Sequence, residues 1–234
     1  MAKARLNRQM SIETDEEATD APRSWNDPLV LLTVALVMMS FAGLGFWAGA
    51  RMGTPGQNSP EAGFARDMAQ HHAQAVDMAT MLRENSADPE MRQIALDIML
   101  TQQAQIGQIQ GWLNVWGLPR ARIGPAMSWM GMPTTDPMPG MATSEQMNRL
   151  RGLKGLEADG LFLSLMIPHH RGGVGMARAI LERSQRPEVR DLAEAIINAQ
   201  ESEIAMMQEL LQQKGFPPVP DEPGMQMDHG NMTP

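Results

Sequence analysis

The sequence lacks cysteine altogether: none of its 234 residues carries a thiol. Neither a disulfide nor a thiolate metal ligand can therefore contribute to the fold or to a binding site. An exported chain without thiols can neither mispair nor be oxidised outside the cytoplasm. The absence of cysteine thus agrees with export, although it does not establish export by itself.

The sequence also lacks the motifs of common catalytic sites. It has no glycine-rich phosphate-binding loop, no His-Glu-x-x-His zinc motif and no serine in a nucleophile motif. No glutamate stands three residues before a histidine, so the Glu-x-x-His pairs of a carboxylate di-iron bundle are excluded. The formal net charge of -8 disfavours nucleic acid as a partner. We therefore predict a protein that is not an enzyme and that binds no nucleic acid.

One long apolar run lies near the N-terminus, where residues 29–50 contain no charged side chain. At about 1.5 Å per residue, a helix of this length crosses a hydrocarbon layer of roughly 30 Å. We predict an uncleaved transmembrane anchor over residues 29–50. The alternative is a cleavable signal peptide, because Ala48-Gly49-Ala50 resembles a small-residue cleavage site.

The charges before the apolar run predict its orientation. The four basic residues of the tail 1–28 favour a cytoplasmic tail, since acidic residues count little in this rule. The remainder would then lie on the periplasmic or extracellular side of the cell membrane. A linker over residues 51–60, rich in Gly and Pro, would tether the rest of the chain to the anchor. The basic residues are Lys3, Arg5, Arg8 and Arg23.

A pattern repeats within the chain at a constant offset of 98 residues. Each copy opens with Phe-x-x-x-Met-x-x-His-His-x-x-x-Val-x-Met-Ala, and no gap is needed to align the copies. Duplication of one folded unit explains this match. The repeated residues are Phe64, Met68, His71, His72, Val76, Met78, Ala79 and Gln102 in the first copy and Phe162, Met166, His169, His170, Val174, Met176, Ala177 and Gln200 in the second.

The pattern of each copy predicts a helical hairpin. Apolar residues recur at steps of three and four from about residue 60 to 86, which is typical of an amphipathic helix. Asp88-Pro89-Glu90 then supplies an N-cap and a proline at the first helical position, and the second helix ends at Gly117. The second copy repeats this layout. We predict an all-α fold with a four-helix bundle over residues 61–217, preceded by one N-terminal transmembrane helix.

Three segments depart from the helical pattern. The crossover 118–143 is rich in Met and Pro, and the tail 218–234, with its Met and His residues, is predicted to be disordered. Pro168 stands directly before His169, where the helix should kink or restart. Either the kink is tolerated, with Gly172 and its neighbours admitting another helix, or the break directs two imidazoles toward a shared site.

The paired histidines and their flanking methionines are the candidate metal ligands. On a helix each His-His pair shares a face with methionines one or two turns away. Neutral imidazole and thioether suit copper, with Cu(I) favoured and Cu(II) possible. Because histidine must be deprotonated to bind, affinity should fall below roughly pH 6.5. The predicted ligands are Met68, His71, His72, Met78, Met166, His169, His170 and Met176.

The sequence allows other interpretations. The histidines could be core residues held by carbonyls or by acids such as Asp67 and Asp77, with methionine as flexible filler. Glu84, Glu182 and Glu201 could hold metal-binding histidines in place, or could simply be solvated. Methionines of the crossover, which lack a helical partner surface, could collect metal or reflect biased composition. A cell-surface protein-interaction module with structural or pH-sensing histidines is the alternative function.

The stretches FARDMAQHHAQAVDMA and FLSLMIPHHRGGVGMA resemble the duplicated signature of the domain of unknown function 305 family. The resemblance covers about residues 60–217. It implies a ferritin-like four-helix bundle, export beyond the inner membrane and, from characterised relatives, copper binding through Met and His. A metal-delivery protein would be a partner. Asp77 has Gly175 as its counterpart, so the resemblance implies two halves with unequal roles.

Overall fold

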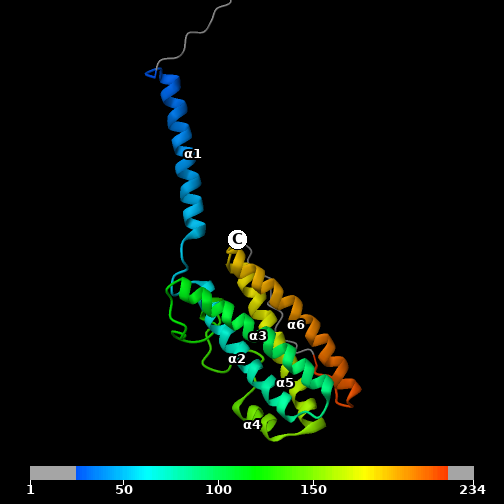
Figure 1. Cartoon of the computed structure of the whole chain (residues 1–234). Helices are drawn as coiled ribbons and strands as arrows, with labels where there is room; N and C mark the ends of the chain where they lie inside the picture. Colours follow the sequence, from blue (N-terminus) through cyan, green and yellow to red (C-terminus); the bar gives the residue numbers. More distant parts are fainter. Residues whose placement is uncertain (1–24, 221–234) are drawn as a thin grey trace, which may run out of the picture. The chain divides into compact units, whose positions relative to one another are not determined.

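The computed structural model describes residues 25–220 of the chain. The chain divides into two compact units, residues 1–52 and 53–234. The predicted cytoplasmic tail falls largely, and the Met/His tail almost entirely, outside the described residues. Within the described part, the secondary structure comprises six α-helices and one short 3-10 helix, without a strand (Figure 1).

The first unit contains helix α1, Pro28–Met52. Its segment Pro28–Phe46 has a mean hydropathy of 2.3 and is long and apolar enough to cross a membrane. The hydroxyl groups of Thr33 and Ser40 donate to the carbonyls of Leu29 and Leu36, at 2.7 and 2.8 Å. These polar groups are thus satisfied within the helix, as an apolar environment requires.

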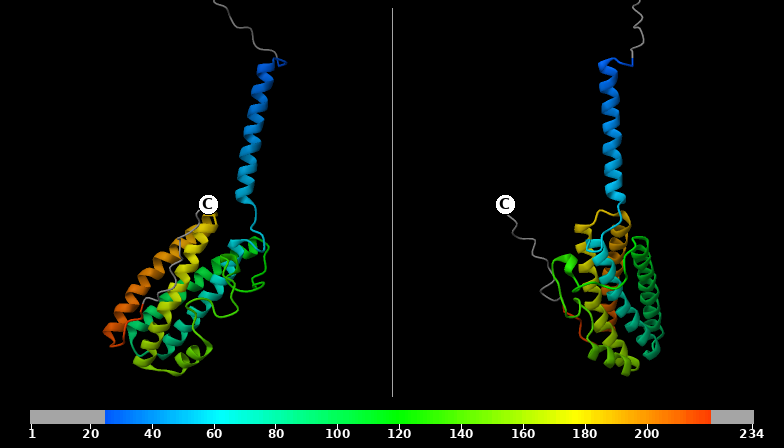
Figure 2. Two further views of the ribbon diagram at one scale, coloured as in Figure 1. Left: turned by 180° about the vertical axis from the view of Figure 1, so that it is seen from behind. Right: turned by 90° about the vertical axis from the view of Figure 1, so that its left-hand side faces the viewer.

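The second unit is built from two helical hairpins. The first consists of α2, Pro60–Asn85, and α3, Pro89–Val115. The second consists of α5, Gly155–Arg183, and α6, Pro187–Gln213. The four helices lie side by side as a bundle (Figure 2). The predicted all-α fold, a four-helix bundle of repeated hairpins after an N-terminal apolar helix, is confirmed.

Local sequence signals explain most helix boundaries. Ser59 caps α2 by accepting a hydrogen bond from the backbone of Ala62, and Asp88 caps α3 by accepting one from Glu90. Proline occupies an initial position of α2, α3 and α6, where its missing N–H has no helical partner. Gly117 and Gly215 follow α3 and α6 with positive φ angles of 67° and 81°, which glycine adopts without strain.

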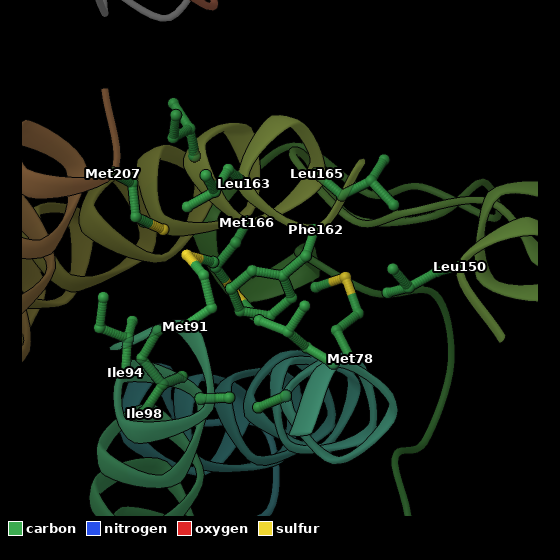
Figure 3. Packing of buried hydrophobic residues seen from close by; sticks show 14 of the residues in the cluster. Met78, Met91, Ile94, Ile98, Leu150, Phe162, Leu163, Leu165, Met166 and Met207 are labelled. Carbon is green, nitrogen blue, oxygen red and sulfur yellow. The ribbon is translucent and has the colours of Figure 1, made fainter. Parts of the chain in front are cut away.

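Two hydrophobic clusters show how α2 and α5 run past each other. The first cluster joins the end of α2, including Met78, to the beginning of α5, including Phe162 and Met166 (Figure 3). The second joins the beginning of α2, including Met68, to the end of α5, including Met176. The two helices are therefore antiparallel neighbours, and their midpoints meet between the clusters.

The crossover between the hairpins runs along one side of the bundle (Figure 2). It contains the 3-10 helix Ser128–Met130 and leads into the short helix α4, Ser144–Gly152. Met127 and Met138 are buried in the second cluster, so the prediction that the crossover methionines lack a helical partner surface is wrong for them. At Met127 the crossover is held by the buried carboxylate of Asp67, which accepts hydrogen bonds from the Met127 backbone at 2.8 Å and from Trp129 at 3.0 Å.

Of the kink or restart predicted at Pro168, the restart does not occur, because α5 continues through this residue; the kink stays a prediction. The crossover turn Met138–Met141, closed by a hydrogen bond from the Met141 N–H to the Met138 carbonyl, packs on this stretch of α5. A Cβ atom built on Gly140 would lie 2.1 Å from the Pro168 carbonyl oxygen, and one built on Gly172 would lie 2.1 Å from the Pro139 carbonyl oxygen. Gly172 thus admits a loop rather than a helix.

Candidate metal site

Four histidines form one layer in the middle of the bundle, two from α2 and two from α5. All four are fully buried. Because the two helices are antiparallel and related by the repeat, equivalent residues meet near their crossing point. The imidazole rings of His71 and His169 lie with their centroids 3.8 Å apart and their planes tilted by 32°. We refer to His71, His72, His169 and His170 as the histidine layer.

The inner histidines of the layer bond to backbone carbonyls. His169 Nε2 lies 3.0 Å from the carbonyl oxygen of His71. His71 Nε2 does not make the reciprocal bond and instead lies 3.3 Å from the carbonyl oxygen of Pro139 in the crossover turn. The crossover therefore breaks the symmetry of the repeat at the centre of the layer.

The outer histidines bond to side chains of the second helix in each hairpin. His72 Nε2 lies 2.7 Å from Gln105 Oε1, and His170 Nε2 lies 2.7 Å from Glu203 Oε2. Gln105 and Glu203 occupy equivalent repeat positions, so the two bonds are the same contact made by an amide in one half and a carboxylate in the other. Sequence reasoning missed both residues, because a search for identical residues passes over a Gln/Glu pair.

The carboxylates suggested from sequence do not hold the histidines. Asp67 bonds to the crossover, whereas Asp77 is exposed. Glu84, Glu182 and Glu201 are exposed as well, and Glu201 pairs with Arg178. The carbonyl partners considered from sequence do occur for the inner histidines.

The hydrogen bonds determine which ring nitrogen is left for other chemistry. A carbonyl or carboxylate oxygen can only accept, so a neutral His71, His169 or His170 donates from Nε2 and carries its lone pair on Nδ1. The Nδ1 atoms of all four histidines are buried without a hydrogen-bond partner. The side-chain amides of Gln102 and Gln200, equally buried, also lack partners.

Burial lowers the pKa values of three histidines of the layer. Desolvation lowers the pKa of His71 to about 4, partly offset by its bond to Pro139. The pKa of His72 falls to about 3 through desolvation and the neighbouring His71, and that of His169 is well below its usual value for the same reasons. The predicted fall of metal affinity below about pH 6.5 stays a prediction, but these three side chains become protonated only at lower pH than an ordinary histidine. They remain deprotonated, as metal binding requires, in moderately acidic solution.

The four predicted methionines are buried on both sides of the histidine layer. Met68 and Met176 belong to one hydrophobic cluster, whereas Met78 and Met166 belong to the other. Among residues 25–220, no three or more side chains of His, Asp or Glu come together as a metal-binding group. A site built here would thus combine few imidazole nitrogens with thioether sulfur, a donor set that suits a soft cation.

The chain matches one protein family over most of its length. The family described as domain of unknown function (DUF305) matches residues 61–232. No curated protein gives a significant match.

Three solved structures illustrate the similarity. A DUF305 protein of Streptomyces coelicolor, inferred to be secreted, is 43% identical, with a TM-score of 0.68, covering 71% of this chain and 100% of that one. A DUF305 fragment from Deinococcus radiodurans is 37% identical, with a TM-score of 0.56, covering 66% and 96%. CopM in its Cu(I)-bound form is 26% identical, with a TM-score of 0.50, covering 66% and 96%. The chain belongs to the DUF305 family.

Proposed function

We propose that this chain is a membrane-anchored, extracytoplasmic metal-binding protein that captures copper and buffers it or hands it on without turnover. The single observation that carries the proposal is the state of the histidine layer. Each ring has one nitrogen held by an acceptor and the other, Nδ1, buried and unpaired.

This hydrogen-bond pattern is the one that metal-binding histidines require. A histidine ligand commonly donates its second ring N–H to a carbonyl or carboxylate, which fixes both the tautomer and the ring orientation. Buried polar atoms without partners are rare in folded proteins, because each loses its hydration without compensation. A cation bound at Nδ1 would supply the missing partner.

The nature of the donors favours copper. Imidazole nitrogen binds Cu(I) and Cu(II), whereas thioether sulfur favours the softer Cu(I). The proposed ligands are the histidine layer together with Met68, Met78, Met166 and Met176, which are buried in the two hydrophobic clusters on either side of the layer. The Cu(I)-bound state of CopM shows that one structurally similar protein binds this ion.

The N-terminal helix supports the proposed location. Its exposed apolar side chains in the segment Pro28–Phe46 suit a hydrocarbon environment, and residues 53–234 fold as a separate unit. With a cytoplasmic tail, the bundle would face the periplasm or the exterior, where a protein delivering or receiving copper would be its partner.

The test is a titration of the full-length chain in detergent micelles with Cu(I), using a competing chelator under anaerobic conditions. We expect tight binding by the wild type and strong weakening in the double variant His71→Ala/His169→Ala. Circular dichroism must show that the variant remains helical. Paired Met→Leu substitutions, M68L/M176L and M78L/M166L, identify the methionines that contribute, with M91L as a buried control outside the set.

A second candidate function rests on the complete burial of the layer. Four fully buried, hydrogen-bonded histidines could serve only to fix the register of the hairpins in a cell-surface protein-interaction module. Unchanged Cu(I) affinity in the folded double variant would favour this interpretation over copper binding. Oxygen consumption with Cu(II) and a reductant separately tests for copper-dependent oxidation.

A further inference from the structure

The two halves of the candidate site differ in charge. Glu203 is the one carboxylate in the described part of the chain that bonds to a histidine of the layer, at 2.7 Å from His170. The equivalent position in the first half holds the neutral Gln105, at the same distance from His72. The buried amides of Gln102 and Gln200 carry no charge, and a histidine that binds a metal ion must be deprotonated.

A cation entering this layer leaves water behind. An ion in a buried site is unfavourable unless an opposite charge lies close by, because the low-dielectric interior does not replace its hydration. Glu203 supplies one negative charge, through a hydrogen bond to a ring that would carry the metal on its other nitrogen. One such charge balances a univalent ion but leaves a divalent ion uncompensated.

We propose that Glu203 is the charge-balancing residue of the site and that it restricts the histidine layer to a single univalent soft cation, Cu(I) or Ag(I). This inference rests on the proposed function, since it names the oxidation state and the positioning residue of the same site. Gln105 orients His72 in the same manner but supplies no charge.

The repeat provides variants that separate charge from structure. Glu203→Gln reproduces the arrangement already present at Gln105, so the helical fold should be retained. Gln105→Glu adds a second carboxylate at the equivalent position. The double exchange Gln105→Glu/Glu203→Gln moves the single charge from one half to the other. Glu201→Gln is the matched control, because Glu201 is exposed and pairs with Arg178.

The experiment measures the affinities of full-length protein in detergent micelles for Ag(I), for Cu(I) under anaerobic reducing conditions, and for Cu(II) without reductant. We expect Glu203→Gln, which keeps the orienting bond and removes the charge, to weaken Ag(I) and Cu(I) binding by about 10- to 100-fold, the usual effect of changing the outer hydrogen-bond partner of a metal-binding histidine. The double exchange should restore most of this loss. Gln105→Glu should raise the affinity for Cu(II) relative to that for Cu(I) by about tenfold or more. Glu201→Gln should leave the affinities for all three ions unchanged.

The outcomes distinguish this inference from the function on which it rests. Unchanged Ag(I) and Cu(I) affinity in Glu203→Gln, combined with loss in His71→Ala/His169→Ala, overturns the role of Glu203 and leaves copper binding intact. A double exchange that binds as weakly as Glu203→Gln shows a local structural role and also overturns charge balance. Absence of Cu(I) and Ag(I) binding by the wild type overturns both proposals.

Discussion

His71 and His169, separated by 98 positions in the sequence, contact each other through their rings, with centroids 3.8 Å apart, and His169 Nε2 also lies 3.0 Å from the His71 carbonyl. Two imidazoles this close inside a protein cannot both be protonated, since two buried positive charges would repel each other strongly. The contact therefore couples the stability of the bundle to the protonation of its histidines.

Acid should destabilise the metal-free protein well before its carboxylates titrate. The pKa values of His71, His72 and His169 are lowered in the folded state, to about 4 and about 3 for the first two. Between pH 6.5 and about 4 the unfolded chain thus binds more protons, and the free energy of unfolding falls as pH falls. Each histidine contributes at most about 1.4 kcal/mol per pH unit.

Urea unfolding at pH 7.5, 6.0 and 5.0 measures this dependence. We expect a nearly constant free energy above pH 6.5 and a progressive loss below it. Asp67 acts in the opposite direction, because burial raises its pKa: as pH falls, its effect begins at the raised pKa of the folded state and is complete near the unfolded value of 3.8. A free energy of unfolding that is equal at pH 7.5 and 5.0 would contradict the prediction.

Univalent soft metal should stabilise the folded chain. A ligand that binds only the folded state adds about 2.7 kcal/mol when its free concentration is 100 times its Kd. We expect Ag(I), added in chloride-free buffer, to raise the melting temperature of the full-length protein and to reduce its acid sensitivity. Removal of the ion with thiosulfate should reverse both effects. A melting temperature that silver leaves unchanged, or lowers, would argue against binding within the bundle.

The contact between the crossover turn and α5 should depend on the missing side chain of Gly172. An alanine Cβ there would lie 2.1 Å from the Pro139 carbonyl oxygen, so the turn that bonds to His71 would have to move. We expect Gly172→Ala to destabilise the protein by about 1–3 kcal/mol. The control is Gly107→Ala in α3, where no atom lies within 4 Å and where the second repeat already has Ala205. That change should stabilise by roughly 0.5–1 kcal/mol, and destabilisation of similar size in both variants would refute the steric explanation.

Sequence reasoning predicted features that depend on local signals and on the repeat. Ser59, Asp88 and Gly117 act within a few residues of their own positions, so the hairpins could be identified from the sequence. The partners of the histidines depend on hairpin register and on the crossover, which has no periodic pattern. Because the crossover has no such pattern, the sequence could not predict the bond between His71 and the Pro139 carbonyl. Pro168 shows a different limit of sequence reasoning: the local signal is present, but tertiary packing overrides the preference of proline to end a helix.

The buried amides of Gln102 and Gln200 should weaken the fold. Neither side chain has a hydrogen-bond partner, and an unsatisfied buried polar group costs roughly 1–3 kcal/mol. Methionine is similar in shape and apolar, so we expect Gln102→Met, and likewise Gln200→Met, to raise the free energy of unfolding of the metal-free protein by about 1 kcal/mol or more. Urea unfolding with and without Ag(I) provides the measurement.

Gln105→Met is the matched control for these substitutions, because Gln105 bonds to His72 at 2.7 Å and its removal leaves both ring nitrogens unpaired. The free energy of unfolding of this variant should fall by an amount comparable with the rise expected for Gln102→Met. If Gln102→Met and Gln105→Met are destabilised equally, Gln102 must have a partner such as bound water. Stabilisation by Gln102→Met together with weaker Ag(I) binding would instead mean that the buried amides are retained for metal binding at the expense of stability. Functional sites commonly depart from optimal packing in this way.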